Sequence, residues 1–518
     1  MYKNKVILLN FLPTIESSYV KKGSIYPSTA TLLLGTTLKK NGFDVQIIDG
    51  AYYEDYLEIL RKSILEDQEK ILYIGMSVMV TQIPFALEAS KIIKKCNRSI
   101  PVVWGGPHPT LFPEQTLKNE NVDIVAINEG TFTALDLAEC IKKSKELSSV
   151  KGIGFKDENN RIFFTSPSEL EEINKLPHFD FSLIDITNYT STGDFSPYRR
   201  EFPRFNGEFK IMPILTGLGC PYKCEFCINV ILKRRYRFRS AESIIEEIKN
   251  LQDNYGVNTF LFYDEDFFIN KRRTLEFISL VEKEELHFNF RMWCRVDHFK
   301  DDYIDSELIK RLCRIGYGSL AMGGESGDSE VLINLKKGIT PEQIMDSLRI
   351  LSKCENIFPR YSFIVGLENE TMEQIKNTYR FCLDMKKINP DVDIAGPFVF
   401  RLYPGSPIFN RIVEKYKLKL PDSLELWSES ITSFGSVEKM PWTPFEFQKK
   451  SELLVFYSLY ALGYYKNELK NYKQILIFLL SKFSLFRIKY FLFIFPFEYW
   501  MYLVVMRFRK IAEIRLIK

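Results

Sequence analysis

The chain has 518 residues, of which 46% are hydrophobic and 26% are charged, and it contains nine cysteines. This composition is typical of a globular protein and excludes disordered, collagen-like and small disulfide-stabilised chains. The net charge of +4 is too small to indicate a nucleic-acid-binding protein. No export signal is predicted, so we expect a cytoplasmic protein with reduced thiols, in which clustered cysteines bind metal or act in catalysis.

Residues 1–145 are predicted to form a doubly wound, flavodoxin-like α/β domain, because short apolar runs alternate with helical patterns. Helices are predicted over 28–40, 53–65 and 83–95, and strands over 6–9, 45–48, 71–76, 101–104 and 122–127. Strands that are apolar nearly throughout are typical of a parallel sheet with both faces covered. Ligands of such a domain bind beyond the carboxyl ends of the strands.

The loops at these strand ends are the candidate binding loops of the first domain. They cover 10–14, 49–50, 77–81, 105–108 and 128–131. Gly105, Gly106 and Gly130 would let the backbone approach a ligand closely, although glycines that only make turns would look the same.

Residues 146–205 are predicted to be a connector, with a polar hairpin turn at 157–160 followed by irregular, proline-punctuated sequence. Residues 206–410 return to alternating strands and helices, and Thr340 and Thr371 each begin a helical capping box. Strands are predicted over 211–216, 259–263, 288–294, 319–322, 361–365 and 394–401. This spacing predicts six βα units, arranged as a partial barrel or an open sheet.

The remaining region, 411–518, is predicted to be helical and rich in aromatic residues. From Lys470 onward there are ten Lys or Arg against two Asp or Glu, and thirteen of 49 residues are aromatic. Charges and a proline interrupt every long apolar stretch, so no transmembrane helix is predicted. An amphipathic helix is expected here, either as a cap on the core or as a peripheral contact with a membrane surface.

Three cysteines with the spacing C-x3-C-x2-C directly follow the first strand of the second domain: Cys220, Cys224 and Cys227. A structural zinc needs a fourth ligand, and ordinary ferredoxin clusters need four cysteines with other spacings. Three cysteines without a fourth suit a 4Fe-4S cluster with one iron open to a small molecule. The other six cysteines are predicted to be small hydrophobic residues of the core: Cys96, Cys140, Cys294, Cys313, Cys354 and Cys382.

This motif, with an aromatic residue just before its last cysteine, resembles the signature of the radical S-adenosylmethionine (SAM) superfamily. The resemblance implies that the open iron chelates SAM and that electron transfer cleaves SAM to a 5′-deoxyadenosyl radical. An unactivated C–H bond is beyond the reach of side-chain acid–base chemistry, so a cofactor must carry that step. A reductase, flavodoxin or ferredoxin is the implied electron donor.

The resemblance also implies SAM contacts at the ends of successive strands. Polar groups after the second strand would hold the amino group, an arginine after the third the carboxylate, and a glutamate after the fourth the ribose. The implied residues are Phe226, Asp264, Glu265, Arg295, Glu325, Ile364 and Gly366. Two features depart from the family pattern: the usual Gly-Gly-Glu is absent after the second strand, and Glu368-Asn369 replaces a common Pro-Gly.

The first domain resembles the cobalamin-binding domain that precedes the radical core in one branch of the superfamily, on the stretches 26–27, 42–49, 103–109 and 127–131. The implied cobalamin contacts are Leu12, Pro13, Ser77, Val78, Gly105, Gly106, Glu129 and Gly130. The Asp-x-His-x-x-Gly motif that supplies a lower cobalt ligand is missing. We therefore predict no protein nitrogen beneath cobalt, with His108 held in a proline-restricted turn. The alternative is a degenerate domain kept as a scaffold.

Together these resemblances, over roughly residues 1–410, imply a cobalamin-dependent radical SAM enzyme that methylates an unactivated carbon of a small-molecule or peptide-derived substrate. In the family mechanism one SAM methylates cob(I)alamin and a second yields the radical. The substrate radical then takes the methyl group from methylcobalamin. Oxidative cyclisation or rearrangement without methyl transfer is the alternative chemistry. A non-catalytic cobalamin or SAM sensor is disfavoured, because binding alone needs no redox cluster.

Overall fold

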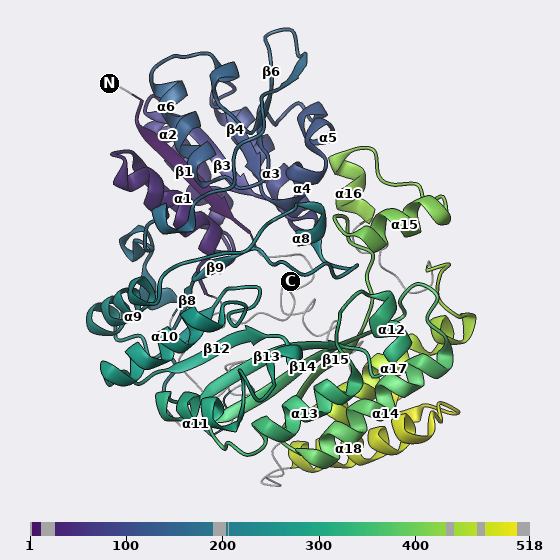
Figure 1. The fold of residues 1–518 in the computed structure, drawn as a ribbon. Coiled ribbons are helices and arrows are strands. Elements are labelled where there is room, and N and C mark those ends of the chain that lie inside the picture. The colour runs from purple at the N-terminus through teal and green to yellow at the C-terminus, as the bar shows by residue number, and fades with distance from the viewer. Residues whose placement is uncertain are drawn as a thin grey trace.

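The computed structural model describes residues 3–11, 26–189, 202, 204–205, 207–430, 440–463 and 472–504. Two α/β units lie one above the other, the amino-terminal unit at the top of Figure 1 and the second unit below it. Helices that follow the second sheet in the sequence lie against both units. The predicted fold class is confirmed.

The first unit contains five parallel strands in the order β2-β1-β3-β4-β5. The strands are β1 (Lys5–Asn10), β2 (Asp44–Asp49), β3 (Ile71–Ser77), β4 (Val102–Gly105) and β5 (Ile124–Ala126). The helices are α1 (Thr29–Lys40), α2 (Tyr56–Asp67), α3 (Ile83–Cys96), α4 (Pro107–Leu111), α5 (Pro113–Lys118) and α6 (Thr131–Lys142). Separate hydrophobic clusters, one around Trp104 and one around Tyr73, cover the two faces, as the continuous apolar strands predict.

The predicted hairpin of the connector extends this sheet. β6 (Ile153–Lys156) pairs antiparallel with β5, and β7 (Ile162–Phe164) pairs antiparallel with β6, so the sheet has seven strands. Without the hairpin β5 would be an unprotected edge strand. The sheet therefore continues past residue 145, where the sequence places the end of the first domain.

The second unit is an open sheet of six parallel strands in the order β15-β14-β13-β12-β11-β8. The strands are β8 (Ile211–Ile214), β11 (Thr259–Phe262), β12 (Asn289–Cys294), β13 (Gly318–Glu325), β14 (Ile357–Val365) and β15 (Asp393–Val399). Its helices are α9 (Ala241–Tyr255), α10 (Lys271–Lys283), α11 (Ser306–Ile315), α12 (Ser329–Asn334), α13 (Pro341–Leu351) and α14 (Met372–Ile388). The capping boxes predicted at Thr340 and Thr371 are both present. A sheet in sequence order with β8 and β15 at its edges is the arc of a partial barrel.

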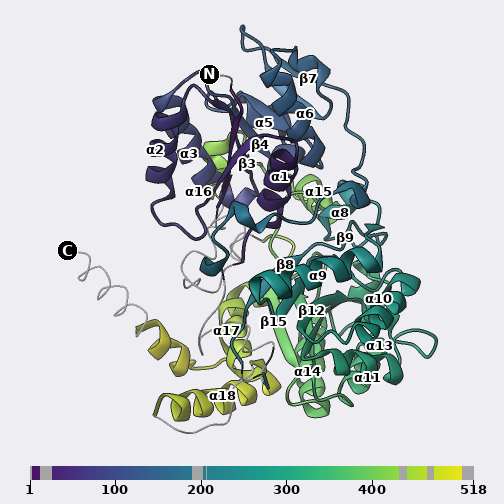
Figure 2. The same cartoon turned by 90° about the vertical axis from the view of Figure 1, so that its left-hand side faces the viewer.

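The carboxyl-terminal region does not form a single helical unit. Its helices are α15 (Pro407–Lys415), α16 (Leu424–Ser430), α17 (Phe445–Leu462) and α18 (Tyr472–Tyr490). Helix α16 packs on α3 of the first unit, where the Trp427 indole is buried and donates to Gln115 Oε1 at 2.9 Å. Helices α17 and α18 pack on each other beside α14, at the opposite end of the molecule (Figure 2).

The cysteine predictions need one correction. Cys313 and Cys354 form a disulfide with a Cα–Cα distance of 6.7 Å, so the prediction that all cysteines are reduced is wrong for this pair. Cys313 lies near the end of α11 and Cys354 follows α13, and these two helices pack side by side. Cys140, Cys294 and Cys382 are buried free thiols, as predicted, and Cys96 is half-buried.

Candidate functional site

The three motif cysteines lie in the loop between two short antiparallel strands, β9 (Gly217–Leu218) and β10 (Arg237–Phe238). Cys227 precedes the short helix α8 (Ile228–Ile231). Gly219, directly before Cys220, has a φ of +79°, and a Cβ there would lie 2.3 Å from the carbonyl oxygen of Arg235. Only glycine fits at this position, because the two sides of the loop approach each other so closely.

The three thiols are free of disulfides; Cys224 is buried, while Cys220 and Cys227 are half-buried. Burial raises the pKa of Cys220 to about 11, and Asp266 and the other two cysteines add to the shift. Burial and Cys224 likewise raise the pKa of Cys227. These thiols therefore stay protonated unless a cationic centre binds them as thiolates, as an iron–sulfur core would.

Among the described residues, no three His, Cys, Asp or Glu side chains converge as they would around a single metal ion. A cubane cluster does not need such convergence, because each cysteine binds a different iron. The loop is therefore compatible with a cluster, in which the three thiols do not share one ion.

Arg295, which follows β12, lies directly against the cysteine loop. Its guanidinium stacks 3.7 Å over the Tyr222 ring and pairs with both oxygens of Asp297 at 2.9 and 3.1 Å. Its Nη1 lies 4.0 Å from Cys224 Sγ, and its Nη2 donates to the carbonyl of Lys337 at 2.6 Å. The predicted carboxylate-binding residue is thus fixed at the edge of the cluster site.

Glu325, at the end of β13, forms a buried ion pair with Lys337. Lys337 Nζ lies 2.8 Å from Glu325 Oε1, and the two side chains are 9% and 7% exposed. Glu325 has a φ of +62°, an uncommon conformation for a residue other than glycine and one that clusters at functional sites. Lys337 also lies 5.6 Å from the centre of the Phe226 ring. Lys337 could not be identified from the sequence, because nothing in its spacing marks it as the partner of Glu325.

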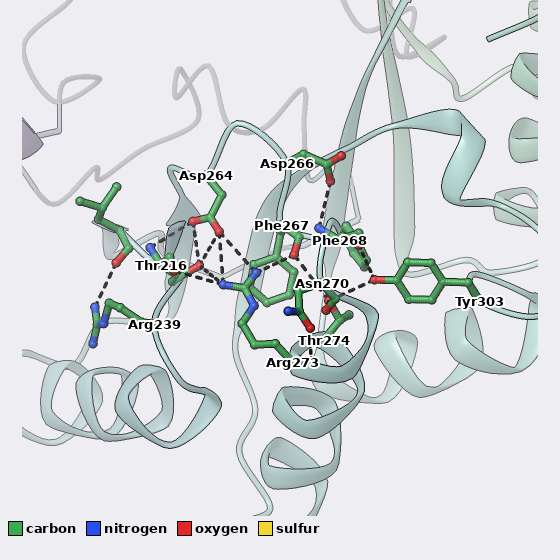
Figure 3. A network of polar contacts seen from close by, with 11 residues as sticks. Thr216, Arg239, Asp264, Asp266, Phe267, Phe268, Asn270, Arg273, Thr274 and Tyr303 are labelled. Carbon is green, nitrogen blue, oxygen red and sulfur yellow. Dashed lines mark hydrogen bonds and ion pairs between the residues drawn. The ribbon is translucent and has the colours of Figure 1, made fainter. Parts of the chain in front are cut away.

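Asp264, predicted to hold the SAM amino group, is engaged within the protein (Figure 3). Its oxygens accept hydrogen bonds from the Thr216 backbone at 3.0 Å and the Thr216 hydroxyl at 2.7 Å, and they pair with Arg273 at 3.4 Å. Arg273 also donates to the carbonyl of Phe267 at 2.6 Å. This fully buried network joins the ends of β8 and β11, so Asp264 holds the sheet together at the site.

The neighbouring Glu265 is exposed and is held by Asn229, whose Nδ2 donates to Glu265 Oε1 at 3.1 Å. The surrounding protein nevertheless removes enough water to raise the pKa of Glu265. Asp266 accepts from the Phe268 backbone at 2.9 Å and lies 2.8 Å from His298 Nε2. Of these three acids, Glu265 is the one whose residue is exposed.

The predicted adenine strand, β14, ends in a tightly braced turn. Ile364 and Phe226 pack against the same hydrophobic cluster. Gly366 has a φ of +80°, its carbonyl accepts from the Trp442 indole at 3.1 Å, and its N–H donates to Glu370 at 2.6 Å. Asn369 has a φ of +64°, which asparagine tolerates better than most residues, so this departure from the family pattern keeps a left-handed turn.

A cavity of about 350 Å³ lies at the carboxyl ends of β1, β3, β4 and β5. Five predicted cobalamin contacts line it: Ser77, Gly105, Gly106, Glu129 and Gly130. Leu215, Leu218 and Arg234 of the second unit complete the wall. A Cβ on Gly130 would meet no atom within 4 Å, so the backbone there is open to a large ligand.

Two other predicted contacts, Leu12 and Pro13, lie outside the described residues. Val78 does not line the cavity, because its side chain is fully buried in the core below. Its backbone N–H donates to the carbonyl of Gly105 at 2.8 Å, and its carbonyl accepts from the N–H of His108 at 3.0 Å.

Glu129 links the cavity wall to the cysteine loop. Arg237 Nη1, on β10, donates to Glu129 Oε2 at 2.7 Å, and the Glu171 N–H donates to the same oxygen at 2.8 Å. Although burial alone would raise it, these bonds lower the pKa of Glu129. The Glu171 side chain in turn accepts from the Phe132 N–H at 3.0 Å, at the start of α6. The loop after β5 is therefore fixed from the second unit and from the connector.

His108 packs among aromatic rings and does not line the cavity. Its ring centre lies 5.3 Å from that of Phe112 and 5.8 Å from that of Trp427. Neither ring nitrogen has a hydrogen-bond partner, and burial lowers the pKa to about 3. No histidine lines the cavity within the part of the chain that the structure describes.

Comparison with known proteins agrees with this architecture. The B12 binding domain family matches residues 20–138, and the radical SAM superfamily matches residues 214–382. An uncharacterized methyltransferase, PH0819 of Pyrococcus horikoshii, is 28% identical over 78% of this chain and 82% of its own length. The anaerobic magnesium-protoporphyrin IX monomethyl ester cyclase of Cereibacter sphaeroides is 26% identical, over 76% of this chain and 62% of its own length.

Two solved structures share the fold. The radical SAM methyltransferase TsrM from Kitasatospora setae superposes with a TM-score of 0.62 at 18% identity, covering 80% of this chain and 76% of TsrM. The cobalamin-dependent SAM radical enzyme OxsB superposes with a TM-score of 0.65 at 18% identity, covering 93% of this chain and 75% of OxsB.

The chain is thus a radical SAM enzyme with a B12 binding domain before the radical SAM domain. The radical SAM domain implies a 4Fe-4S cluster and SAM as cofactors, and the B12 binding domain implies cobalamin.

Proposed function

We propose that this enzyme transfers a methyl group to an unactivated carbon of a small-molecule or peptide-derived substrate. The observation that carries the proposal is the shared wall of the two cofactor sites. Residues 217–239 carry the three motif cysteines and also contribute Leu218 and Arg234 to the cavity of the first unit. The cysteine loop and the cavity of the first unit therefore lie beside the same segment. A substrate carbon that loses hydrogen near the cysteine loop would then be close to the methyl carrier in the cavity.

In this proposal Cys220, Cys224 and Cys227 hold the cluster, and Glu265, Arg295 and Glu325 orient SAM. The cluster supplies an electron, SAM supplies the hydrogen-abstracting radical and the methyl group, and cobalamin carries that methyl group. Phe226 and Ile364 give the SAM site an apolar side that excludes water. Ser77 and the glycines after β4 and β5 let the backbone lie close to a large planar ligand.

One relative named as a methyltransferase supports methyl transfer, and another named as a synthase supports the alternative of cyclisation or rearrangement. A cytidylyl-2-hydroxyethylphosphonate methyltransferase of Streptomyces wedmorensis is 21% identical over 76% of this chain. A 4′-phospho-dehydrooxetanocin synthase of Priestia megaterium is 24% identical over 70% of this chain. The competing proposal is therefore cyclisation or rearrangement without methyl transfer.

The test is product analysis of the anaerobically reconstituted, chemically reduced protein with SAM and cobalamin. A methyltransferase forms both 5′-deoxyadenosine and S-adenosylhomocysteine, whereas a cyclase forms 5′-deoxyadenosine alone. Cys227→Ala is the negative control, and Cys96→Ala, a half-buried cysteine outside the motif, is the matched control. Absence of S-adenosylhomocysteine with every candidate substrate would refute methyl transfer.

A further inference from the structure

Residues 475–504, which we call the tail surface, expose an unusual amount of apolar side chain. Seventeen of the thirty large hydrophobic side chains that are exposed in the described structure lie within this segment. Phe495, Ile494 and Leu476 are 76%, 69% and 60% exposed. Contiguous apolar patches this extensive mark sites that contact another protein or a membrane.

One side of the tail surface packs on α14 and α17. Ser484 and Ile488, one helical turn apart on α18, are fully buried, and the Phe493 ring stacks 5.8 Å from that of Tyr457. The other faces of α18 point outward with bulky residues: Ile475, Leu476, Leu479, Phe483, Phe486 and Tyr490. Core packing therefore accounts for a small part of the apolar surface. Figure 2 shows α18 at the margin of the molecule, away from the first unit.

The charge of the tail surface is positive. Lys482 and Lys489 are exposed, whereas Glu498, the one acid between residues 475 and 504, is 6% exposed and paired with Arg487 at 2.8 Å. From Lys470 to the end, the sequence has ten basic and two acidic residues. A second copy of the chain would bring like charges together, whereas an anionic lipid surface complements both the charge and the apolar side chains.

An apolar cavity of about 700 Å³ opens on this surface. Its walls include Leu479, Phe483, Phe486, Ile494 and Phe497, and Lys482 stands among them. Within the described residues no helix has both the length and the low charge needed to cross a bilayer. We propose that the tail surface docks on an anionic phospholipid bilayer with α18 in the plane of the interface. An acyl chain occupies the cavity, and Lys482 meets a lipid phosphate.

The test is flotation of the full-length, anaerobically purified protein with vesicles. Vesicles of phosphatidylcholine alone are compared with vesicles of phosphatidylcholine and phosphatidylglycerol, at low and high salt. We expect flotation with the anionic vesicles, weakened by salt. The triple variant Leu476→Ser, Ile494→Ser, Phe495→Ser should lower partitioning by about tenfold or more, because it removes apolar area that enters the bilayer. Lys482→Glu with Lys489→Glu should abolish the preference for phosphatidylglycerol.

A matched control removes equally exposed apolar side chains elsewhere: Leu65→Ser, Ile333→Ser and Phe445→Ser, at sites that are 57%, 72% and 69% exposed. This variant should float like the wild type. Light scattering without lipid tests the alternative that a second copy of the chain covers the surface. In that case the wild type would be a dimer and the tail triple variant a monomer. That result, or equal flotation of the wild type and the tail triple variant, would overturn the proposal. The proposed methyl transfer does not depend on this outcome, since 5′-deoxyadenosine and S-adenosylhomocysteine are measured without lipid.

Discussion

Removing Lys337 would leave the Glu325 carboxylate as an unpaired charge next to the predicted SAM site. At their separation of 2.8 Å, the attraction between the two groups is about 6 kcal/mol for an effective dielectric constant of about 20. Desolvation of both groups offsets part of this attraction, but breaking a buried pair from one side costs about 3–5 kcal/mol. We therefore expect Lys337→Met to lower the free energy of unfolding by about 3–5 kcal/mol.

The double variant Lys337→Met, Glu325→Gln removes both charges. Its free energy of unfolding should therefore exceed that of Lys337→Met alone by about 2 kcal/mol or more. Urea unfolding of the three variants measures this coupling. SAM affinity separates the second role of Glu325, because loss of a charged hydrogen bond to ribose costs about 1.5–3 kcal/mol. Glu325→Gln should therefore weaken SAM binding by about tenfold or more in both backgrounds.

The matched control is Lys387→Met, which breaks an ion pair with Asp384 whose side chains are 77% and 54% exposed. It should change stability by less than about 1 kcal/mol. If the effects of Lys337→Met and Glu325→Gln on unfolding simply add, the two charges do not stabilise each other and the reasoning fails. Unchanged SAM affinity and turnover in Glu325→Gln would remove this residue from the SAM site.

Three further predictions follow from the two cofactor sites and the turn after β14. Replacing Cys220, Cys224 or Cys227 with Ala should abolish cluster absorbance and 5′-deoxyadenosine formation. If a variant lacking all three cysteines still formed this product, these cysteines would not be the cluster ligands. The pKa of Glu370 is raised by burial from 4.5 to about 8. The folded state then binds the proton more tightly, so unfolding free energy should fall as pH rises from 4.5 to about 8, and Glu370→Gln should lose this dependence in urea titrations. The electron paramagnetic resonance spectrum of the cob(II)alamin protein should be the same in the wild type and in His108→Ala, because His108 is buried away from the cavity. Nitrogen splitting that is lost in the variant would show that His108 ligates cobalt.

Local pattern was enough to predict most of the fold. The apolar runs became parallel strands because a strand covered on both faces has no polar side, and Thr340 and Thr371 begin helices because capping boxes are local. The cysteine loop could be placed at the end of β8 because the motif directly follows that strand. Five of the eight predicted cobalamin contacts line the cavity for the same reason, since each lies at the end of a strand or in the loop that follows it.

Contacts between side chains that are distant in the sequence could not be predicted from the sequence. Asp264 binds Arg273 and Thr216, so an acid in the expected place is part of the framework, while the neighbouring residue Glu265 is exposed. Trp427 fills the core of a domain that ends more than 260 residues earlier. Such pairings depend on which side chains the tertiary structure brings together, and sequence spacing carries no signal for them.

The segment from Gly217 to Arg239 contributes to both the cysteine loop and the cavity of the first unit. It carries the cysteine loop, it adds Leu218 and Arg234 to the cavity wall, and its Arg237 holds Glu129 of the first unit. The positive charge of Arg234 acts on both Glu129 and Glu265, one at each site. A displacement of the first unit would therefore pull on the loop that positions the cysteines.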